Sequence, residues 1–296
     1  MKWNDPARAN GRLRAHDVFT LAYLGVGLLL ILMFAGRLPN PLTLGAWHLG
    51  GMAAIVLARK ARIERNVIGA LVMDFYPVVL FSYLYLEVQV LNRIFTPEGF
   101  HDVLVMEWED AVFGRQLSQT LHQEWPIRWL GEYLHLSYFL YYIIVPIMAF
   151  TVRFTRSVED YERAIATVAA SFYLSFLCFI VLPVTGPYHV FTVDSPEKYG
   201  YLMPKVVRWV LDRGSSMGTA FPSSHVSVSV ATWIVALRFA KPVAVLYLFI
   251  VPTLALGAIY GGYHYATDTV AGAVRGVLAG TVGLMLATRV GKRAWS

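Results

Sequence analysis

The chain has 296 residues, of which 57% are hydrophobic and only 15% are charged, and its mean hydropathy is +0.53. Soluble domains carry about 25% charged residues, so this composition excludes an ordinary soluble enzyme. A net charge of +6 would suggest nucleic-acid binding in a soluble protein, but here the distribution of the charges indicates membrane topology instead. The single cysteine, Cys178, excludes a disulfide framework and a cysteine-based metal site.

Long runs without Asp, Glu, Lys or Arg follow one another along the chain. About 20 such residues cross a bilayer as a helix, so we predict an all-α, polytopic transmembrane helix bundle with about eight spans. The first span follows Arg12 and Arg14 and is expected to stay uncleaved, because no small-residue cleavage pattern comes after it. The predicted spans cover residues 17–36, 42–58, 67–91, 127–152, 162–184, 220–240, 242–260 and 267–289.

An even number of spans places both termini on one side of the membrane. Of the 25 Lys and Arg residues, 16 then lie on that side and seven on the other, while Arg128 and Arg275 lie inside spans. An excess of Lys and Arg marks the cytoplasmic side, so the termini are expected in the cytoplasm. We predict one integral membrane domain over residues 1–296, and the short loops favour a bacterial plasma membrane.

Two long loops fall on the non-cytoplasmic side. Residues 92–126 place Trp108, Phe113 and Leu117 among charges, which predicts an amphipathic helix packed on the membrane surface or on the bundle. In the second loop, residues 185–219, a short helix is expected over residues 204–211.

A first motif, Phe221-Pro222-Ser223-Ser224-His225, stands at the start of the sixth predicted span. Proline suits the first turn of a helix, where its missing N–H costs nothing. The free N–H groups of Ser223, Ser224 and His225 would then face outward at a positive helix terminus, which can bind a phosphate. Both serine hydroxyls can add donors, and His225 can pass a proton to a leaving oxygen.

A second motif, Tyr263-His264-Tyr265-Ala266-Thr267-Asp268, lies between the seventh and eighth predicted spans, also on the non-cytoplasmic side. Asp268 is expected as the N-cap of the eighth span. Its carboxylate can accept a hydrogen bond from one ring nitrogen of His264. The other nitrogen would remain as a nucleophile for phosphorus.

Together the two motifs resemble those of the phosphatidic acid phosphatase type 2 superfamily, over roughly residues 127–290. That family carries P-S-G-H at one helix start and S-R-x5-H-x3-D at the next connection. Pro222-Ser223-Ser224-His225 matches the first, with Ser224 in the glycine position, and His264-x3-Asp268 matches the end of the second. The resemblance implies a six-helix phosphatase-type core, a phosphohistidine on His264 oriented by Asp268, His225 as the acid, and no metal or other cofactor.

The chain also departs from the family pattern. The family's Ser-Arg would fall on Gly257-Ala258, and its upstream K-x6-R-P is not found. Such losses resemble the branch of inositol phosphorylceramide synthase and related sphingolipid synthases. That resemblance implies transfer of a phospho-headgroup from one lipid to an acceptor alcohol.

Other residues are candidates for contact with the substrate. Positive charge near the phosphate is expected from Lys205, Arg208, Arg213 or Arg275, although Arg275 is favoured slightly to pair with Asp74 in the third span. Polar side chains near the outer face add three candidate substrate-binding residues: Tyr188, His189 and His135. The tyrosine-rich stretch 138–142 is expected to pack the bundle rather than to form a site.

The predicted function is therefore a lipid phosphotransferase, with a lipid-phosphate phosphatase as the alternative. Its partners would be a phospholipid or lipid-phosphate substrate and membrane lipids, with no nucleic acid. Two other classes stay open: a transporter that uses Asp74 and Arg275, and a zinc hydrolase with His225, His264 and Asp268 as ligands.

Overall fold

The computed structural model describes residues 10–191 and 199–295, and these residues are almost entirely helical. The only β-type pairing in the described ranges is an isolated bridge between Val184 and Thr219. The helices are α1 (Ala15–Met33), α2 (Pro41–Lys60), α3 (Val67–Leu91), α4 (Asp102–Phe113), α5 (Leu117–Glu124), α6 (Arg128–Phe139), α7 (Tyr141–Thr155), α8 (Val158–Val181), α9 (Pro187–Val190), α10 (Met203–Gly214), α11 (Ser224–Phe239), α12 (Lys241–Tyr260) and α13 (Ala266–Trp295).

The predicted all-α polytopic bundle is confirmed. Six helices, namely α1, α2, α3, α8, α12 and α13, are long and apolar enough to cross a membrane. The predicted span 127–152 is two helices, α6 and α7, which meet at a bend of 47° and together form a possible seventh span. The predicted span 220–240 is the apolar helix α11, which has 16 residues and is shorter than a usual span.

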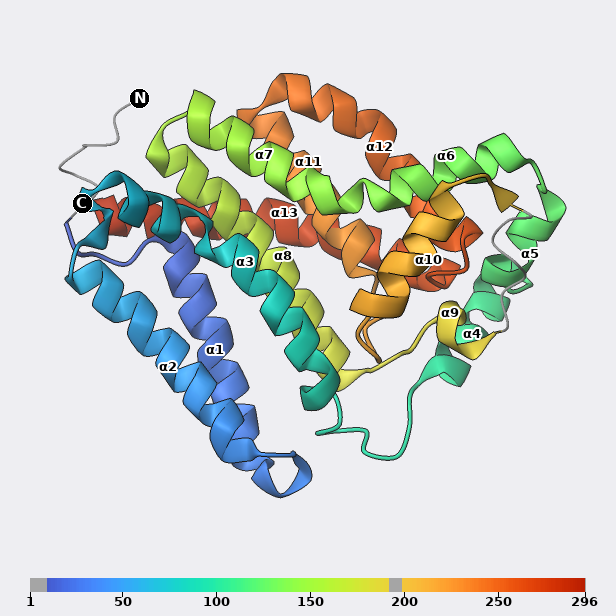
Figure 1. Cartoon of the computed structure of the whole chain (residues 1–296), viewed down its shortest axis with the longest axis horizontal. Helices are drawn as coiled ribbons and strands as arrows, with labels where there is room; N and C mark the ends of the chain where they lie inside the picture. Colours follow the sequence, from blue (N-terminus) through green and yellow to red (C-terminus); the bar gives the residue numbers. More distant parts are fainter. Residues whose placement is uncertain (1–9, 192–198, 296) are drawn as a thin grey trace.

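The shorter helices gather at one end of the bundle. Figure 1 shows the start of α1 and the end of α13 at the opposite end from α4, α5, α9 and α10. The amphipathic segment expected within residues 92–126 is a pair of helices, α4 and α5, and the short helix expected over residues 204–211 is part of α10. The segments between the long helices therefore build a cap over one end.

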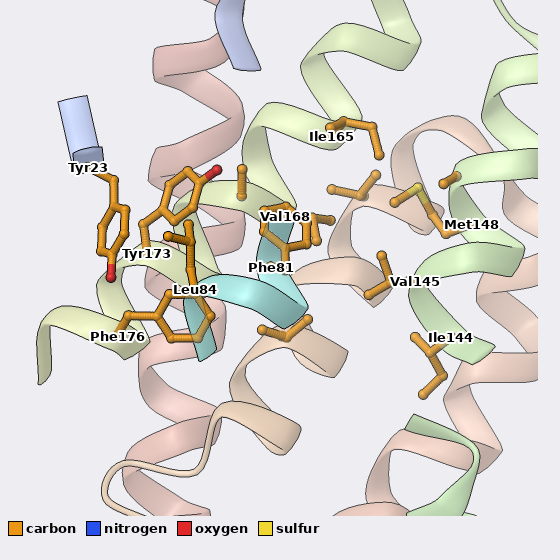
Figure 2. Close-up of a cluster of buried hydrophobic side chains, with 14 of the residues drawn as sticks. Tyr23, Phe81, Leu84, Ile144, Val145, Met148, Ile165, Val168, Tyr173 and Phe176 are labelled. Atoms are coloured by element: carbon orange, nitrogen blue, oxygen red, sulfur yellow. The ribbon is translucent and has the colours of Figure 1, made fainter. Parts of the chain in front are cut away.

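A cluster of buried apolar side chains joins α1 and α3 to the rest of the bundle. In Figure 2, Tyr23 and Phe81 lie next to Tyr173 of α8. The Tyr23 and Tyr173 rings stack with centroids 4.7 Å apart, and Phe81 stacks on Phe172 at 4.2 Å. Aromatic pairs of this kind add about 0.5–1.5 kcal/mol beyond burial, so α1 and α3 are fixed firmly against α8.

Buried ion pairs reinforce the same helices. Arg59 of α2 donates through Nε to Asp17 of α1 at 2.7 Å, and Arg153 of α7 donates to Asp74 of α3 at 2.6 Å. The expected pairing of Asp74 with Arg275 is therefore wrong. Arg153 lies within reach of Asp74 because α3 and α7 both pack on α8.

Helix α11 is central and packs against α8, α12 and α13. Two glycines of α13 allow this close approach. A Cβ atom at Gly272 would lie 2.5 Å from the carbonyl oxygen of Ser223, and one at Gly276 would lie 2.6 Å from that of Ser227. Small residues four apart allow membrane helices to approach closely, and here they bring the two sequence motifs together.

Candidate active site

The first motif forms the N-terminus of α11. The helix begins at Ser224, and Ser223 is its N-cap, with Oγ accepting from the N–H of Val226 at 3.4 Å. The backbone N–H of Ser223 donates to the carbonyl oxygen of Asp268 at 3.0 Å. The sequence predicted Pro222 in the first turn of the helix. In the structure Pro222 instead precedes the N-cap residue. Ser223 is fully buried, and its N–H is not free for a phosphate.

The second motif forms the turn into α13. Asp268 is the third residue of the helix, and its Oδ2 accepts from the N–H of Tyr265 at 2.9 Å. The prediction that Asp268 is the N-cap residue is therefore wrong, because Asp268 lies inside the helix. Its carboxylate still accepts from the backbone N–H of Tyr265, the residue before the helix. Asp268 is fully buried, while His264 keeps 4% of its surface exposed.

The structure brings His225, His264 and Asp268 into one chain of contacts. His264 Nδ1 lies 3.4 Å from Asp268 Oδ2, and His264 Nε2 lies 3.3 Å from His225 Nδ1. His225 Nε2 in turn lies 3.3 Å from the hydroxyl oxygen of Tyr138. A carboxylate that accepts from Nδ1–H leaves Nε2 of His264 with its lone pair, the state that a nucleophile needs.

A network from α4 holds the turn around the histidines. Asp102 accepts from the N–H groups of Thr185 and Gly186, at 3.0 and 2.8 Å, and from the Tyr265 hydroxyl at 3.1 Å. Glu109 accepts from the N–H of Ala266, the first residue of α13, at 3.1 Å. Burial raises the pKa of Glu109 above its ordinary value, although the bonded N–H groups act in the opposite direction.

A small polar pocket of about 40 Å³ opens over the two histidines. Its lining includes His225, His264, Tyr188 and His189, so two of the three predicted substrate-binding residues face the pocket. Burial lowers the pKa of His189, so this ring tends to be neutral. The third, His135, donates from Nδ1 to the carbonyl oxygen of Gly131 at 2.6 Å.

His135 lines a neighbouring pocket of about 30 Å³, which it shares with Tyr188, Tyr263 and Arg208. His135 is therefore in a pocket beside the polar one, and the Tyr263 ring, 5.7 Å from the His135 ring, lines both pockets. The Tyr188 hydroxyl donates to Asp212 at 2.5 Å, and burial raises its pKa to about 12.

A larger, mostly apolar cavity of about 360 Å³ adjoins the polar pocket. The two share Tyr85, Leu211, Ser215 and His225 in their linings. The larger cavity lies between α3, α7, α8 and the end of α10, where Val78, Phe81, Val145 and Phe172 form its walls. The site therefore combines a polar end at the histidines with an apolar compartment.

The predicted phosphate-binding residues fall in different places. Ser224 lines the apolar cavity beside His225, and Arg213 lies at its edge. Lys205 and Arg208 are exposed on α10. Arg275 of α13 donates to the hydroxyl of Ser227 in α11, at 3.1 Å, and to the hydroxyl of Ser175 in α8.

Sequence reasoning missed the tyrosines of the bend between α6 and α7. Tyr138 is 1% exposed and bonds His225, and the Tyr141 ring lies 4.3 Å from the His225 ring. Sequence reasoning assigned this stretch to packing, because nothing in its spacing indicates a bend. Asp102 and Glu109 were also missed, since an acidic amphipathic helix gives no sign that two of its carboxylates point inward.

A metal centre was the competing interpretation of the same residues. In the described part of the chain, no group of three or more His, Cys, Asp or Glu side chains has the arrangement of a metal site. His225 and Asp268 instead contact opposite ring nitrogens of His264.

Comparison with protein families gives one match. The family model described as the PAP2 superfamily matches residues 109–282, which is more than half of the chain and includes both motifs. Comparison with curated proteins and with solved structures gives no significant match. The matched segment begins within α4, so α1, α2 and α3 lie outside it.

Proposed function

The chain belongs to the PAP2 superfamily, and from this we propose that it is a membrane lipid phosphotransferase that acts through a phosphohistidine on His264. Members of the superfamily are phosphatases or phosphotransferases that act on phosphate esters. The observation that carries the proposal is the chain of contacts from Asp268 through His264 to His225 at the polar pocket.

The first half of the reaction follows from the positions of these residues. Asp268 accepts from Nδ1–H of His264 and leaves Nε2 with its lone pair. Nε2 attacks phosphorus, so an N–P bond forms and the P–O bond to the leaving group breaks. His225, protonated on both ring nitrogens, gives its Nδ1 proton to the leaving oxygen.

In the second half, the hydroxyl of an acceptor attacks the phosphohistidine. Its proton passes to Nδ1 of His225, the new O–P bond forms, and the N–P bond breaks. With a phospholipid donor, the phosphate on His264 is still esterified to the headgroup, and a lipid alcohol as acceptor gives a new phosphodiester. With a lipid-phosphate monoester as donor, His264 carries an unsubstituted phosphoryl group, and water gives free phosphate. The transferase and the phosphatase therefore use the same site, and they differ in the donor and the acceptor.

Stabilisation of the phosphate is assigned to groups near the start of α11. The N–H groups of Ser224 and His225 lie in the first turn of the helix, where the helix dipole favours an anion. On α10, Arg208 lines the neighbouring pocket with Tyr188 and Tyr263, and Arg213 lines the apolar cavity with Ser224 and His225. Lys205, which is exposed, and Arg275, which donates to Ser227 and Ser175, would act through the local field.

The apolar cavity supports a lipid as substrate. Its walls of Val78, Phe81, Val145 and Phe172 suit a hydrocarbon chain, and its lining reaches His225. A substrate with its tail in this cavity places its phosphate at the polar pocket. A water-soluble phosphate ester would leave the cavity unused.

Transfer to a lipid acceptor, as in the branch of inositol phosphorylceramide synthase, is favoured by the loss of the family arginine. A Cβ atom at Gly257 would lie 2.3 Å from the carbonyl oxygen of Leu134, and Ala258 is fully buried. Gly257 stands in the position of the family's serine and Ala258 in that of its arginine, so α6 packs closely beside the place where the arginine would begin. We assign the site to the non-cytoplasmic face of a bacterial plasma membrane, because the predicted topology puts 16 of the 25 Lys and Arg residues on the side of the termini and both motifs on the other side.

The test uses purified protein and a panel of lipid phosphates and phospholipids, with and without lipid alcohols. Free phosphate is measured by colorimetry and transferred headgroups by mass spectrometry. Headgroup transfer that is lost in His264→Ala supports the proposal, and phosphate release that is lost in the same variant identifies a phosphatase. Activity that survives in His264→Ala contradicts the phosphohistidine mechanism.

A further inference from the structure

The bend between α6 and α7 brings a tyrosine to the back of the acid histidine. Tyr138 is in the last turn of α6, two residues before the break at Leu140, and it is 1% exposed. Its hydroxyl oxygen lies 3.3 Å from Nε2 of His225, on the opposite side of the ring from His264. The two nitrogens of His225 therefore have different partners, His264 at Nδ1 and Tyr138 at Nε2, and both partners line the polar pocket.

The contact between Asp268 and His264 leads to one assignment of the protons at rest. If Asp268 accepts from Nδ1–H of His264, then Nε2 of His264 is an acceptor. The contact with His225 then requires a proton on His225 Nδ1. In the neutral ring this leaves Nε2 as an acceptor, and the Tyr138 hydroxyl is the donor that it meets.

During the reaction the same hydroxyl must change its role. To protonate the leaving oxygen, the resting ring of His225 must first take up a second proton on Nε2 from solvent. It then gives its Nδ1 proton to the leaving oxygen and is left neutral with a proton on Nε2, until the acceptor hydroxyl returns a proton to Nδ1. A tyrosine hydroxyl both donates and accepts. It can therefore donate to bare Nε2 and accept from Nε2–H, so the ring keeps a partner throughout the cycle.

From these contacts we infer that Tyr138 is a positioning residue for His225: its hydroxyl stabilises the protonated ring and keeps Nδ1 directed at the phosphate. This inference rests on the proposed function. It assigns a role to a residue that lies outside both sequence motifs.

The surroundings of Tyr138 are those of a fixed side chain. Its ring stacks on Tyr263 with centroids 4.5 Å apart and lies 4.9 Å from the His225 ring. Gly257 allows α12 to approach α6 here, since a Cβ atom at 257 would lie 2.3 Å from the carbonyl oxygen of Leu134, one turn before Tyr138. A side chain held on two faces can present its hydroxyl with little loss of rotational freedom on catalysis.

Tyr141 provides a matched control. It lies across the bend from Tyr138, and its ring also contacts His225, at 4.3 Å between centroids. Within the described residues its hydroxyl makes no hydrogen bond to His225. Tyr141→Phe therefore removes a hydroxyl near His225 without removing a partner of the ring.

The experiment measures kcat and KM across pH for the wild type, Tyr138→Phe and Tyr141→Phe. We expect Tyr138→Phe to lower kcat about tenfold with little change in KM. Loss of the acceptor for Nε2–H disfavours the charged ring, so the alkaline limb of the kcat profile should move to lower pH. Tyr141→Phe should leave the limb in place.

A double-mutant cycle separates a role through His225 from a general loss of structure. In a His225→Ala background, Tyr138→Phe should have no further effect on kcat, because the group that it positions is absent. An equal loss in both backgrounds would overturn the inference. If His225→Ala abolishes activity while Tyr138→Phe leaves kcat and the pH limb unchanged, the inference fails and the proposed function stands.

A measurement independent of activity keeps the test open should no substrate be found. Nitrogen NMR of histidine-labelled protein, with the His225 signals assigned through His225→Gln, reports which ring nitrogen carries the proton. Tyr138→Phe should shift the Nε2 signal of His225, and Tyr141→Phe should not. Identical Nε2 signals in the wild type and Tyr138→Phe would overturn the inference.

Discussion

The backbone N–H of Ser223 donates to the carbonyl oxygen of Asp268 at 3.0 Å, so the cap of α11 is hydrogen-bonded to the first turn of α13. This bond joins the two motifs directly through the main chain. It fixes the distance between His225, two residues after the cap, and His264, four residues before Asp268. The geometry of the histidine pair therefore depends on how closely α11 and α13 pack.

Replacement of Asp268 by asparagine tests the orientation of His264. Asparagine keeps the shape of the side chain but removes the charge that holds the Nδ1–H tautomer, so kcat should fall on the order of 100-fold or more. Asp110→Asn, an exposed carboxylate on α4, is the control and should retain full activity. Steady-state kinetics that show equal kcat for both variants would contradict the assigned role.

Replacement of Gly276 by alanine tests the close approach of α11 and α13. The new Cβ atom would lie 2.6 Å from the Ser227 carbonyl oxygen, so unfolding free energy should fall by about 1–3 kcal/mol. Gly283→Ala on the same helix meets its nearest atom, of Thr167, at 3.4 Å and should be neutral or stabilising. Thermal unfolding in detergent compares the two, and a stable Gly276→Ala variant would show that the helices can separate without cost.

The apolar cavity predicts a change in chain-length preference. Val78 lines the cavity, whereas the adjacent Val79 is 73% exposed on the outer surface of α3. Val78→Phe should raise KM for long-chain lipid phosphates several-fold and spare short-chain ones, because the larger ring occupies the compartment. Val79→Phe should change neither. A loss that is equal for long and short chains would place the tail elsewhere.

The buried Glu109 predicts a pH dependence of stability. Its pKa is raised in the folded protein, so the folded state binds this proton more tightly than the unfolded state does. The stabilisation that Glu109 contributes is fully present at pH values below its pKa in the unfolded state. It is lost as the pH rises through its pKa in the folded state. Glutamine at this position keeps an acceptor oxygen and lacks the titration.

Melting temperatures of the wild type and Glu109→Gln at about pH 4.5 and about pH 7.5 check this sign. The melting temperature of the wild type minus that of Glu109→Gln should be smaller, or more negative, at the higher pH. A difference that grows with pH would mean that the three backbone donors outweigh burial and that the carboxylate is favoured when charged.

The helices and the triad could be predicted from sequence because their signals are local. Charge-free runs of about 20 residues predict helices, and the spacing of His264 and Asp268 places both side chains on one face of a turn. The bend at Leu140 has no such signal, and so Tyr138 was assigned to packing. The partner of Asp74 was missed for a related reason, since Arg153 and Asp74 are 79 positions apart and meet only through tertiary packing.

The phosphate site shows a further limit of sequence reasoning. A proline-serine-serine start suggested three free N–H groups, but the donor of Ser223 is taken by Asp268. That bond depends on the glycines of α13, which bring the two helices together. The sequence therefore predicts candidate residues that the structure brings together, while the division between structural groups and groups free to face a substrate depends on helix packing.

The most direct test of the account is to trap the covalent intermediate. Purified protein is mixed with a lipid phosphate labelled on phosphorus, quenched in base, and digested for mass spectrometry of the peptide that contains His264. The account predicts phosphorus on His264, stable in base and labile in acid, and none in His264→Ala. Turnover of the substrate without phosphorus on His264, or equal labelling of His264→Ala at another residue, would contradict it.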